Sequence, residues 1–244
     1  MESVFVSWSG GKDCCLACYR AIESGLDVRY LASMMTEHTR RLWPHHLKPE
    51  ILRLQAEAIG IPLLLNVTTV THYNDKFKDM LRAFRKEGIS GGVFGDVSIS
   101  NGLADKHKKW VDDVCQPEGI NPHRPLWAQG REELIRDLIE QGFEAIIIAA
   151  ERRRLGKELV GRVMDKDLML ELKRRSELSP NGEVGIYHTF VTNGPLFKKR
   201  LELAETRKVL IGNYWYLDIV KGHLIDKTPD DMKTTHTMEA CLTR

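Results

Sequence analysis

Hydrophobic positions in the first half of the chain alternate between short runs and longer amphipathic stretches. Short β-prone runs have the length of buried strands and cover residues 4–8, 28–35, 61–67 and 92–96. Stretches with the helical period cover residues 13–24, 49–59, 74–86 and 103–114. Because strands that alternate with such helices almost always form right-handed crossovers, we predict an α/β fold with a doubly wound parallel sheet. Such sheets bind ligands at the carboxyl ends of their strands.

The second half of the chain follows a different pattern. Residues 117–125 hold three prolines and a glycine with little periodicity, so we interpret them as the connection between two halves. After them come a predicted helix over 132–141, a strongly apolar strand over 143–150, a charged helix ending near Ser176 and a β-rich region over 187–220. We therefore predict a first domain over residues 1–124, a smaller α+β domain over 125–228 and a polar, poorly ordered tail over 229–244.

A glycine-rich turn, Ser9-Gly10-Gly11-Lys12-Asp13, joins the first predicted strand to the first predicted helix. Glycines let backbone amides approach an anion, and the helix N-terminus adds partial positive charge to the hydroxyl of Ser9 and the cation of Lys12. The turn therefore favours phosphate binding, although an ordinary strand-to-helix turn capped by Asp13 uses the same residue types. The turn has neither a Walker ending nor the third glycine of a dinucleotide fingerprint, so a different phosphate geometry is indicated.

Composition narrows the class of protein. The 36 basic and 34 acidic residues leave a formal charge of +2, which supplies no general attraction to nucleic acid. Five cysteines do not resemble a disulfide framework, and one helix face explains the spacing of Cys15 and Cys18 better than a metal or redox site does. The apolar runs are too short to span a membrane and the chain begins directly with a strand, so we expect a cytoplasmic protein without a membrane partner.

Motifs in a specific order along the chain resemble one known family. They cover residues 9–13, 55–62, 92–96, 125–127, 161–165, 182–185, 188–191 and 194–197. Together they resemble the PP-loop ATP pyrophosphatases and, among these, the diphthine-ammonia ligase family, over most of the chain. The resemblance implies a sheet of the HUP/PP-loop type and an enzyme that cleaves ATP to AMP and pyrophosphate.

The resemblance implies an ATP site on the first domain. Its nucleotide-binding residues would be Ser9, Gly10, Gly11, Lys12, Asp13, Cys14, Gly95 and Asp96. Lys12 and the loop amides would stabilise the leaving pyrophosphate, and Asp13 or Asp96 would bind Mg²⁺ together with water and phosphate oxygens. Asp96 follows a predicted strand, where such a sheet binds ligands, although an aspartate that caps the next element would occupy the same place.

The resemblance also implies an acceptor pocket in the second domain. Its substrate-binding residues would be Glu183, Gly185, Tyr187, His188 and Thr189. A carboxylate would attack the α-phosphate of ATP, and ammonia would then displace AMP to form an amide. Lys12, Asp13, Glu183 and His188 would be the catalytic residues, with Glu183 orienting the amine and His188 carrying a proton. A tight turn with solvated Glu183 and His188 is the alternative interpretation.

Two positions depart from the family's pattern and leave the substrate open. Cys14 stands where the family usually has serine, and Ile186 replaces a second acidic residue. In organisms that make diphthamide, the implied carboxylate is diphthine on elongation factor 2. A small carboxylate such as a corrinoid side chain, or a regulatory protein that binds ATP or AMP without turnover, stays open as an alternative. A transfer-RNA-modifying enzyme is disfavoured by the near-neutral charge.

A loop after the second predicted strand contains His45 and His46 next to Trp43 and Pro44. We expect this loop either to close over the nucleotide or to form a packed surface loop. The sequence leaves the oligomeric state open, a homo-oligomer included.

Overall fold

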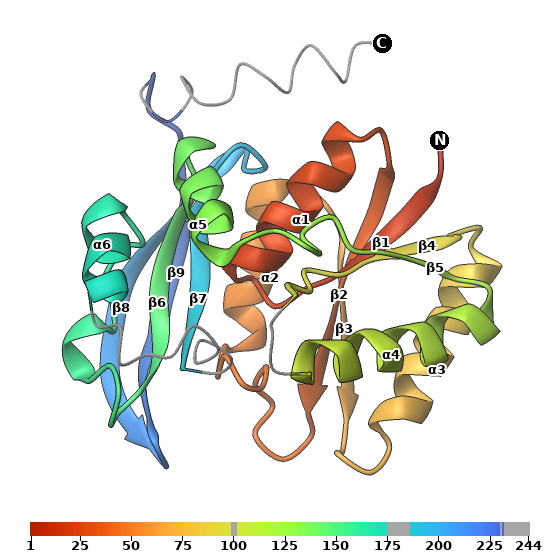
Figure 1. Ribbon diagram of the computed structural model, residues 1–244, viewed down its shortest axis with the longest axis horizontal. Helices are drawn as coiled ribbons and strands as arrows, with labels where there is room; N and C mark the ends of the chain where they lie inside the picture. Colours follow the sequence, from red (N-terminus) through yellow and green to blue (C-terminus); the bar gives the residue numbers. More distant parts are fainter. Residues whose placement is uncertain (99–101, 175–185, 230, 232–244) are drawn as a thin grey trace.

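The computed structural model describes residues 1–98, 102–174, 186–229 and 231, and it forms two sheets with helices between and around them (Figure 1). The first sheet is parallel and has the strand order β3-β2-β1-β4-β5. Its strands are β1 (Ser3–Ser7), β2 (Asp27–Thr36), β3 (Leu63–Thr68), β4 (Gly91–Val93) and β5 (Asn121–His123). The predicted α/β fold with a parallel sheet is confirmed.

Helices cover both faces of the first sheet, as a doubly wound sheet requires. They are α1 (Lys12–Glu23), α2 (Pro49–Ile59), α3 (Tyr73–Lys86) and α4 (Leu103–Cys115). Successive side chains of a strand point to opposite faces, so Val4 and Val6 of β1 join one core with α1 and α2. Phe5 joins a second core with α3 and α4, where its ring stacks on that of Phe84 at 4.9 Å between centroids.

Residues 117–125, predicted to connect the two halves, also contain a strand that the sequence did not indicate. The segment includes the end of a 3₁₀ turn, Gln116–Glu118, and the edge strand β5, which pairs with β4. Ile120 immediately precedes β5 and is buried in the second core, in the same cluster as Phe5 and Phe84. Strand propensity did not indicate β5 because the strand contains Pro122. Proline cannot donate a hydrogen bond to a β-ladder and occurs in sheets mainly at edge strands.

The second sheet is antiparallel and has the order β7-β6-β9-β8. Its strands are β6 (Glu144–Glu151), β7 (Tyr187–Asn193), β8 (Lys199–Ile211) and β9 (Tyr214–Asp226), and its helices are α5 (Arg131–Glu140), α6 (Lys166–Arg174) and the 3₁₀ turn Lys157–Leu159. The predicted α+β domain is thus present. Its β-rich region extends past residue 220, because residues 221–226 pair with residues 199–205 of β8.

Residues 230 and 232–244 of the predicted polar tail lie outside the described residues. The tail's first part is attached to the second sheet. Asp231 accepts hydrogen bonds from Asn193 at 2.6 Å and Arg200 at 3.0 Å, and its other oxygen accepts one from the backbone of Thr228.

One continuous core joins the two domains. α1 packs against β7 and α2 against β8 and β9, so these helices lie between the two sheets (Figure 1). Cys15 and Cys18 are fully buried in this core, as expected for one apolar helix face. Within the described residues, the helices are all too short or too polar to cross a membrane.

Candidate functional site

The strand order reverses between β1 and β4, and the sequence-predicted site lies at this switch point. The glycine turn follows β1, and residues 94–96 follow β4, so both reach the carboxyl edge of the sheet where open α/β sheets bind ligands. A Cβ on Gly95 would lie 2.8 Å from the carbonyl carbon of Asp13 and 2.9 Å from the nitrogen of Cys14. Glycine at position 95 therefore lets the β4 loop contact the start of α1.

The glycine turn is held by groups from both domains. The carbonyl of Gly10 accepts hydrogen bonds from the backbone of Val191 in β7 at 2.9 Å and from Nε2 of Gln55 in α2 at 3.0 Å. The fully buried Gln55 also donates to the Val191 carbonyl at 2.7 Å and accepts from Nε1 of Trp8 at 2.9 Å. Gly10 has φ of +75°, a conformation that favours glycine. The turn is therefore a rigid part of the domain interface.

The amides of the turn have more protein partners than the sequence predicted. The Lys12 amide donates to Oγ1 of Thr189 at 3.0 Å, and the Gly11 amide points at Oγ of Ser9 at 3.4 Å. Thr189, predicted to line the acceptor pocket, thus contacts the glycine turn itself. Helix α1 begins at Lys12 without a side-chain cap, so its first turn keeps the electrostatic character that attracts anions.

Lys12 and Asp13 form an ion pair at the mouth of the turn. Nζ of Lys12 lies 2.8 Å from both carboxylate oxygens of Asp13 and 5.8 Å from the ring centroid of Tyr187. The two side chains keep 19% and 39% of their surface exposed. The cation is therefore held in place but can reach a ligand.

The thiol of Cys14 contacts the glycine turn. Its Sγ lies 3.2 Å from the Gly11 carbonyl and 3.5 Å from Oγ of Ser9. Burial opposes ionisation of this thiol, but hydrogen bonds from Cys15 and Ser9 outweigh it and lower the pKa of Cys14. Burial raises the pKa of both Cys15 and Cys18, which remain protonated core residues.

Asp96 already has two protein partners. Its Oδ1 lies 3.1 Å from Nδ1 of His107, and its Oδ2 lies 3.6 Å from Nε of Arg124. The hydrogen bond to Asp96 raises the pKa of His107. Oδ2 is buried and has no hydrogen-bond partner among the described residues.

The predicted metal ligands do not form a ready-made metal site by themselves. In the part of the chain that the structure describes, no group of three or more His, Cys, Asp or Glu side chains is arranged to hold a metal ion. Oδ2 of Asp96 faces Nε of Arg124 without a hydrogen bond, and both oxygens of Asp13 accept from Lys12. Carboxylate oxygens are ligands that Mg²⁺ prefers, so a magnesium ion that takes its remaining ligands from phosphates and water would share these two carboxylates with the neighbouring cations.

Of the predicted acceptor residues, Glu183 and Gly185 lie outside the described residues. Ile186 is buried with 3% of its surface exposed, so it packs in the core at the start of β7. Tyr187, His188 and Thr189 open β7 and lie next to the glycine turn.

The structure places His45 against His188, a contact that the sequence did not indicate. The two rings lie 4.7 Å apart between centroids. Burial, followed by the charge of Lys12, lowers the pKa of His188 to about 4. Burial and the charges of His188 and Lys12 hold the pKa of His45 well below its ordinary value. Both rings are therefore neutral near pH 7.

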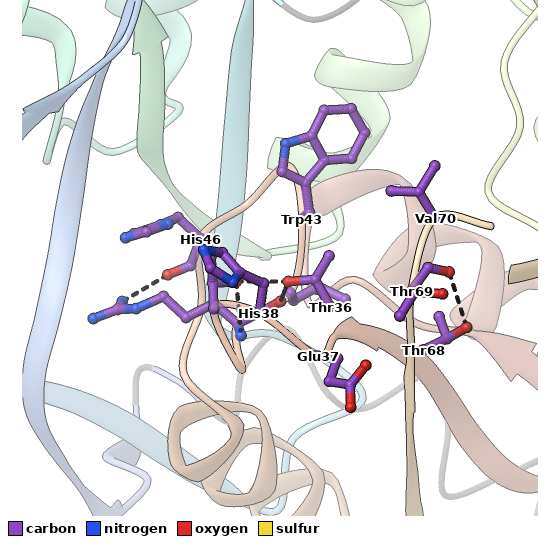
Figure 2. A pocket seen from close by; sticks show the side chains of 11 residues that line it. Thr36, Glu37, His38, Trp43, His46, Thr68, Thr69 and Val70 are labelled. Atoms are coloured by element: carbon purple, nitrogen blue, oxygen red, sulfur yellow. Dashed lines mark hydrogen bonds between the residues drawn. The ribbon is translucent and has the colours of Figure 1, made fainter. Parts of the chain in front are cut away.

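A cavity of about 560 Å³ opens at the carboxyl ends of β2 and β3 (Figure 2). Its lining residues are Thr36, Glu37, His38, Thr39, Arg41, Leu42, Trp43, His46, Thr68, Thr69 and Val70. Trp43 and Val70 are 75% and 89% exposed. The same loop contributes His46 to the cavity and His45 to the glycine turn, so the two places adjoin. The volume is in the range of small-molecule sites.

Comparisons with known proteins agree with the two-domain organisation. The model of the diphthamide synthase N-terminal domain matches residues 2–122, and that of the C-terminal domain matches residues 130–225. A human protein named diphthine-ammonia ligase is 26% identical over 265 residues, which cover 93% of this chain and 96% of the relative.

A relative of the same name from Schizosaccharomyces pombe is 28% identical over 220 residues, and the match covers 82% of this chain. This chain spans only 36% of that longer relative. A solved structure from Methanocaldococcus jannaschii, described as a predicted subunit of tRNA methyltransferase, superposes with a TM-score of 0.44 at 17% identity, covering 78% of this chain and 96% of that one. By its matches to both domain models, the chain belongs to the diphthamide synthase family.

Proposed function

We propose that this protein is an ATP-dependent ligase that adenylates a carboxylate and transfers the acyl group to ammonia, releasing AMP and pyrophosphate. The observation that carries the proposal is the meeting of Lys12 and Asp13 from the first domain with Tyr187, His188 and Thr189 from the second at one switch point. The relatives named diphthine-ammonia ligase support the same reaction class.

In this proposal ATP lies across the carboxyl edge of the first sheet. The pyrophosphate portion would meet Lys12, Ser9, Cys14 and the first turn of α1, where a cation and a helix N-terminus attract anions. The nucleoside would occupy the adjoining cavity, with the base beside Trp43. Lys12 would then exchange part of its contact with Asp13 for a phosphate oxygen.

Magnesium would neutralise charge on the phosphates when it binds with ATP. Asp13, at the first turn of α1, and Asp96, across the switch point, are the residues that would hold it. Gly95 supports this arrangement, because its contact with the Asp13 backbone brings the β4 loop to the start of α1.

The carboxylate would enter from the side of β7. Tyr187, His188 and Thr189, with Glu183 and Gly185 before them in the sequence, would line its site. One carboxylate oxygen would attack the α-phosphorus of ATP while the bond to pyrophosphate breaks. By the names of the relatives, the proposed carboxylate is diphthine. The resemblance of the sequence implies that this carboxylate is carried on elongation factor 2.

A pyrophosphate and AMP release assay tests this function. The protein is incubated with ATP, Mg²⁺, ammonium and candidate carboxylates, diphthine-bearing elongation factor 2 among them. Lys12→Ala and Asp13→Ala should abolish most carboxylate-dependent release. The pair Lys109 and Asp113 on α4 is a matched control, because it is an exposed Lys–Asp ion pair remote from the turn. Release that is equal in all four variants would refute the proposed site, and no release with any carboxylate would favour nucleotide binding without turnover.

A further inference from the structure

Two histidines from different domains meet beside the glycine turn. His45 comes from the loop after β2, and His188 comes from β7, 143 positions later in the sequence. Their rings lie 4.7 Å apart and are inclined by 52°. Nε2 of His45 would lie 3.4 Å from a Cβ built on Gly11, and the Thr189 carbonyl oxygen would lie 3.0 Å from the same point. The pair therefore adjoins the turn on its β7 side.

One nitrogen of this pair lacks a hydrogen bond to any residue that the structure describes. Nδ1 of His45 is buried and has no partner among the described residues. A buried polar atom without a partner costs free energy, so folding stability does not explain a histidine at this position. A ligand that forms a hydrogen bond with Nδ1 would remove this cost.

The surroundings keep both rings in the form that accepts protons. Burial and the nearby cation of Lys12 disfavour the protonated form of each ring; His188 further disfavours protonation of His45, and the carboxylate of Asp13 offsets only part of the effect on His188. A neutral imidazole retains one nitrogen lone pair. The two domains thus place two proton acceptors next to the proposed phosphate site.

We propose that His45 and His188 together bind the amine substrate as neutral ammonia and that one of the two rings accepts the proton that it loses. This inference rests on the proposed ligase function. Ammonia that becomes an amide nitrogen releases one proton, because three N–H bonds become two.

The lone pair of ammonia forms the C–N bond at the acyl carbon, and the nitrogen thereby becomes positively charged. One ring accepts a proton from this nitrogen. The bond from the acyl carbon to the AMP oxygen breaks, and its electron pair leaves with AMP. The ring then returns its proton to water.

The first experiment does not depend on turnover. Protein labelled with ¹⁵N in its histidines is titrated with ammonium chloride and, separately, with tetramethylammonium chloride, which has no N–H group to donate. We expect saturable shifts of the His45 and His188 ring signals with ammonium and none with tetramethylammonium. Equal responses to the two salts, or none to either, would overturn the proposal.

The second experiment separates the amine site from the adenylation site. His45→Leu should retain carboxylate-dependent exchange of pyrophosphate into ATP, while amide formation from ammonium falls by about a hundredfold, the usual contribution of a proton acceptor. His45→Asn, which keeps a polar atom near the position of Nδ1, should recover part of the loss. The exposed His223 on β9 provides the control variant His223→Leu.

The outcomes distinguish the two proposals. Absence of exchange in the unmodified protein would refute the ligase function itself. Exchange with unchanged ammonium dependence in His45→Leu would refute only the amine site. His45→Leu should also unfold at the same or a higher temperature, because it removes an unsatisfied polar atom. A clearly lower unfolding temperature would show that the ring is structural and would overturn the inference.

Discussion

The glycine turn after β1 and the loop after β2 lie at the same edge of the sheet, but they are held differently. The turn is buried and bonded to Gln55 and Val191 from two other elements. The loop carries the exposed Trp43 and lines an open cavity. The comparison teaches that the domain interface fixes the proposed phosphate-binding turn, whereas the proposed nucleoside site lies on a more exposed loop.

Removing the cation of the glycine turn should have the largest effect on activity. Lys12→Ala should lower carboxylate-dependent pyrophosphate release by about a hundred- to a thousandfold, because a charge-directed donor stabilises the leaving group in the transition state. Steady-state release assays measure this loss. A decrease of less than about tenfold would mean that the turn does not carry the chemistry.

The pH dependence of stability tests whether the interface holds His188 neutral. Its pKa in the folded protein, about 4, lies below the ordinary value of 6.5, so the unfolded chain binds this proton first as the pH falls. Stability should therefore be lost between about pH 6.5 and pH 4, by on the order of 3 kcal/mol for this ring. His188→Leu should flatten that part of the curve, as measured by urea unfolding at several pH values. If stability depended on pH equally in His188→Leu and in the unmodified protein, a buried and neutral His188 ring would be contradicted.

Gln55→Leu tests the hydrogen bonds by which Gln55 holds the glycine turn. The change leaves the indole N–H of Trp8 and the carbonyl of Val191 without the side chain that they contact. An unsatisfied buried group costs about 1–3 kcal/mol, so the free energy of unfolding should fall by about 2–3 kcal/mol. The exposed Gln116 at the end of α4 supplies the control Gln116→Leu. Equal stability of the two variants would show that Gln55 does not hold the turn.

Trp43→Ala tests the role of the exposed loop after β2. If the base of ATP lies beside this ring, loss of the aromatic contact should raise the KM for ATP by about tenfold, since such stacking is worth about 1–3 kcal/mol. The maximal rate and the unfolding free energy should change little, because the ring is 75% exposed. A lower maximal rate with an unchanged KM would place the ring near the reacting groups instead.

Cys14→Ser should have the smallest effect. A hydroxyl donates a stronger hydrogen bond than a thiol, so affinity for ATP should rise by about threefold, within the range of one added hydrogen bond. Calorimetric titration with ATP measures the difference. Weaker binding would indicate that the thiol, whose Sγ contacts the Gly11 carbonyl, shapes the turn in a way that serine cannot reproduce.

The sequence predicted correctly those elements whose ends are set by neighbouring residues. The helix predicted over 49–59 has the observed bounds of α2, because Pro49 and Gly60 mark its ends. β5 was missed because Pro122 lies on an edge strand, where it is tolerated but looks like a turn. The buried partners of the turn, Gln55 and Thr189, lie 45 and 177 positions from the residues that they contact, so no spacing rule could pair them.

The sequence by itself determined the alternation of strands and helices, the glycine turn after β1 and the resemblance that points to ATP. These features depend on periodicity, backbone freedom and motifs, which are encoded over a few neighbouring residues. Only the tertiary structure decided that Asp96 meets Arg124 and that His45 packs on His188. Burial and the neighbouring charges lower the pKa of both histidines, and both causes arise only when the two sheets enclose α1 and α2.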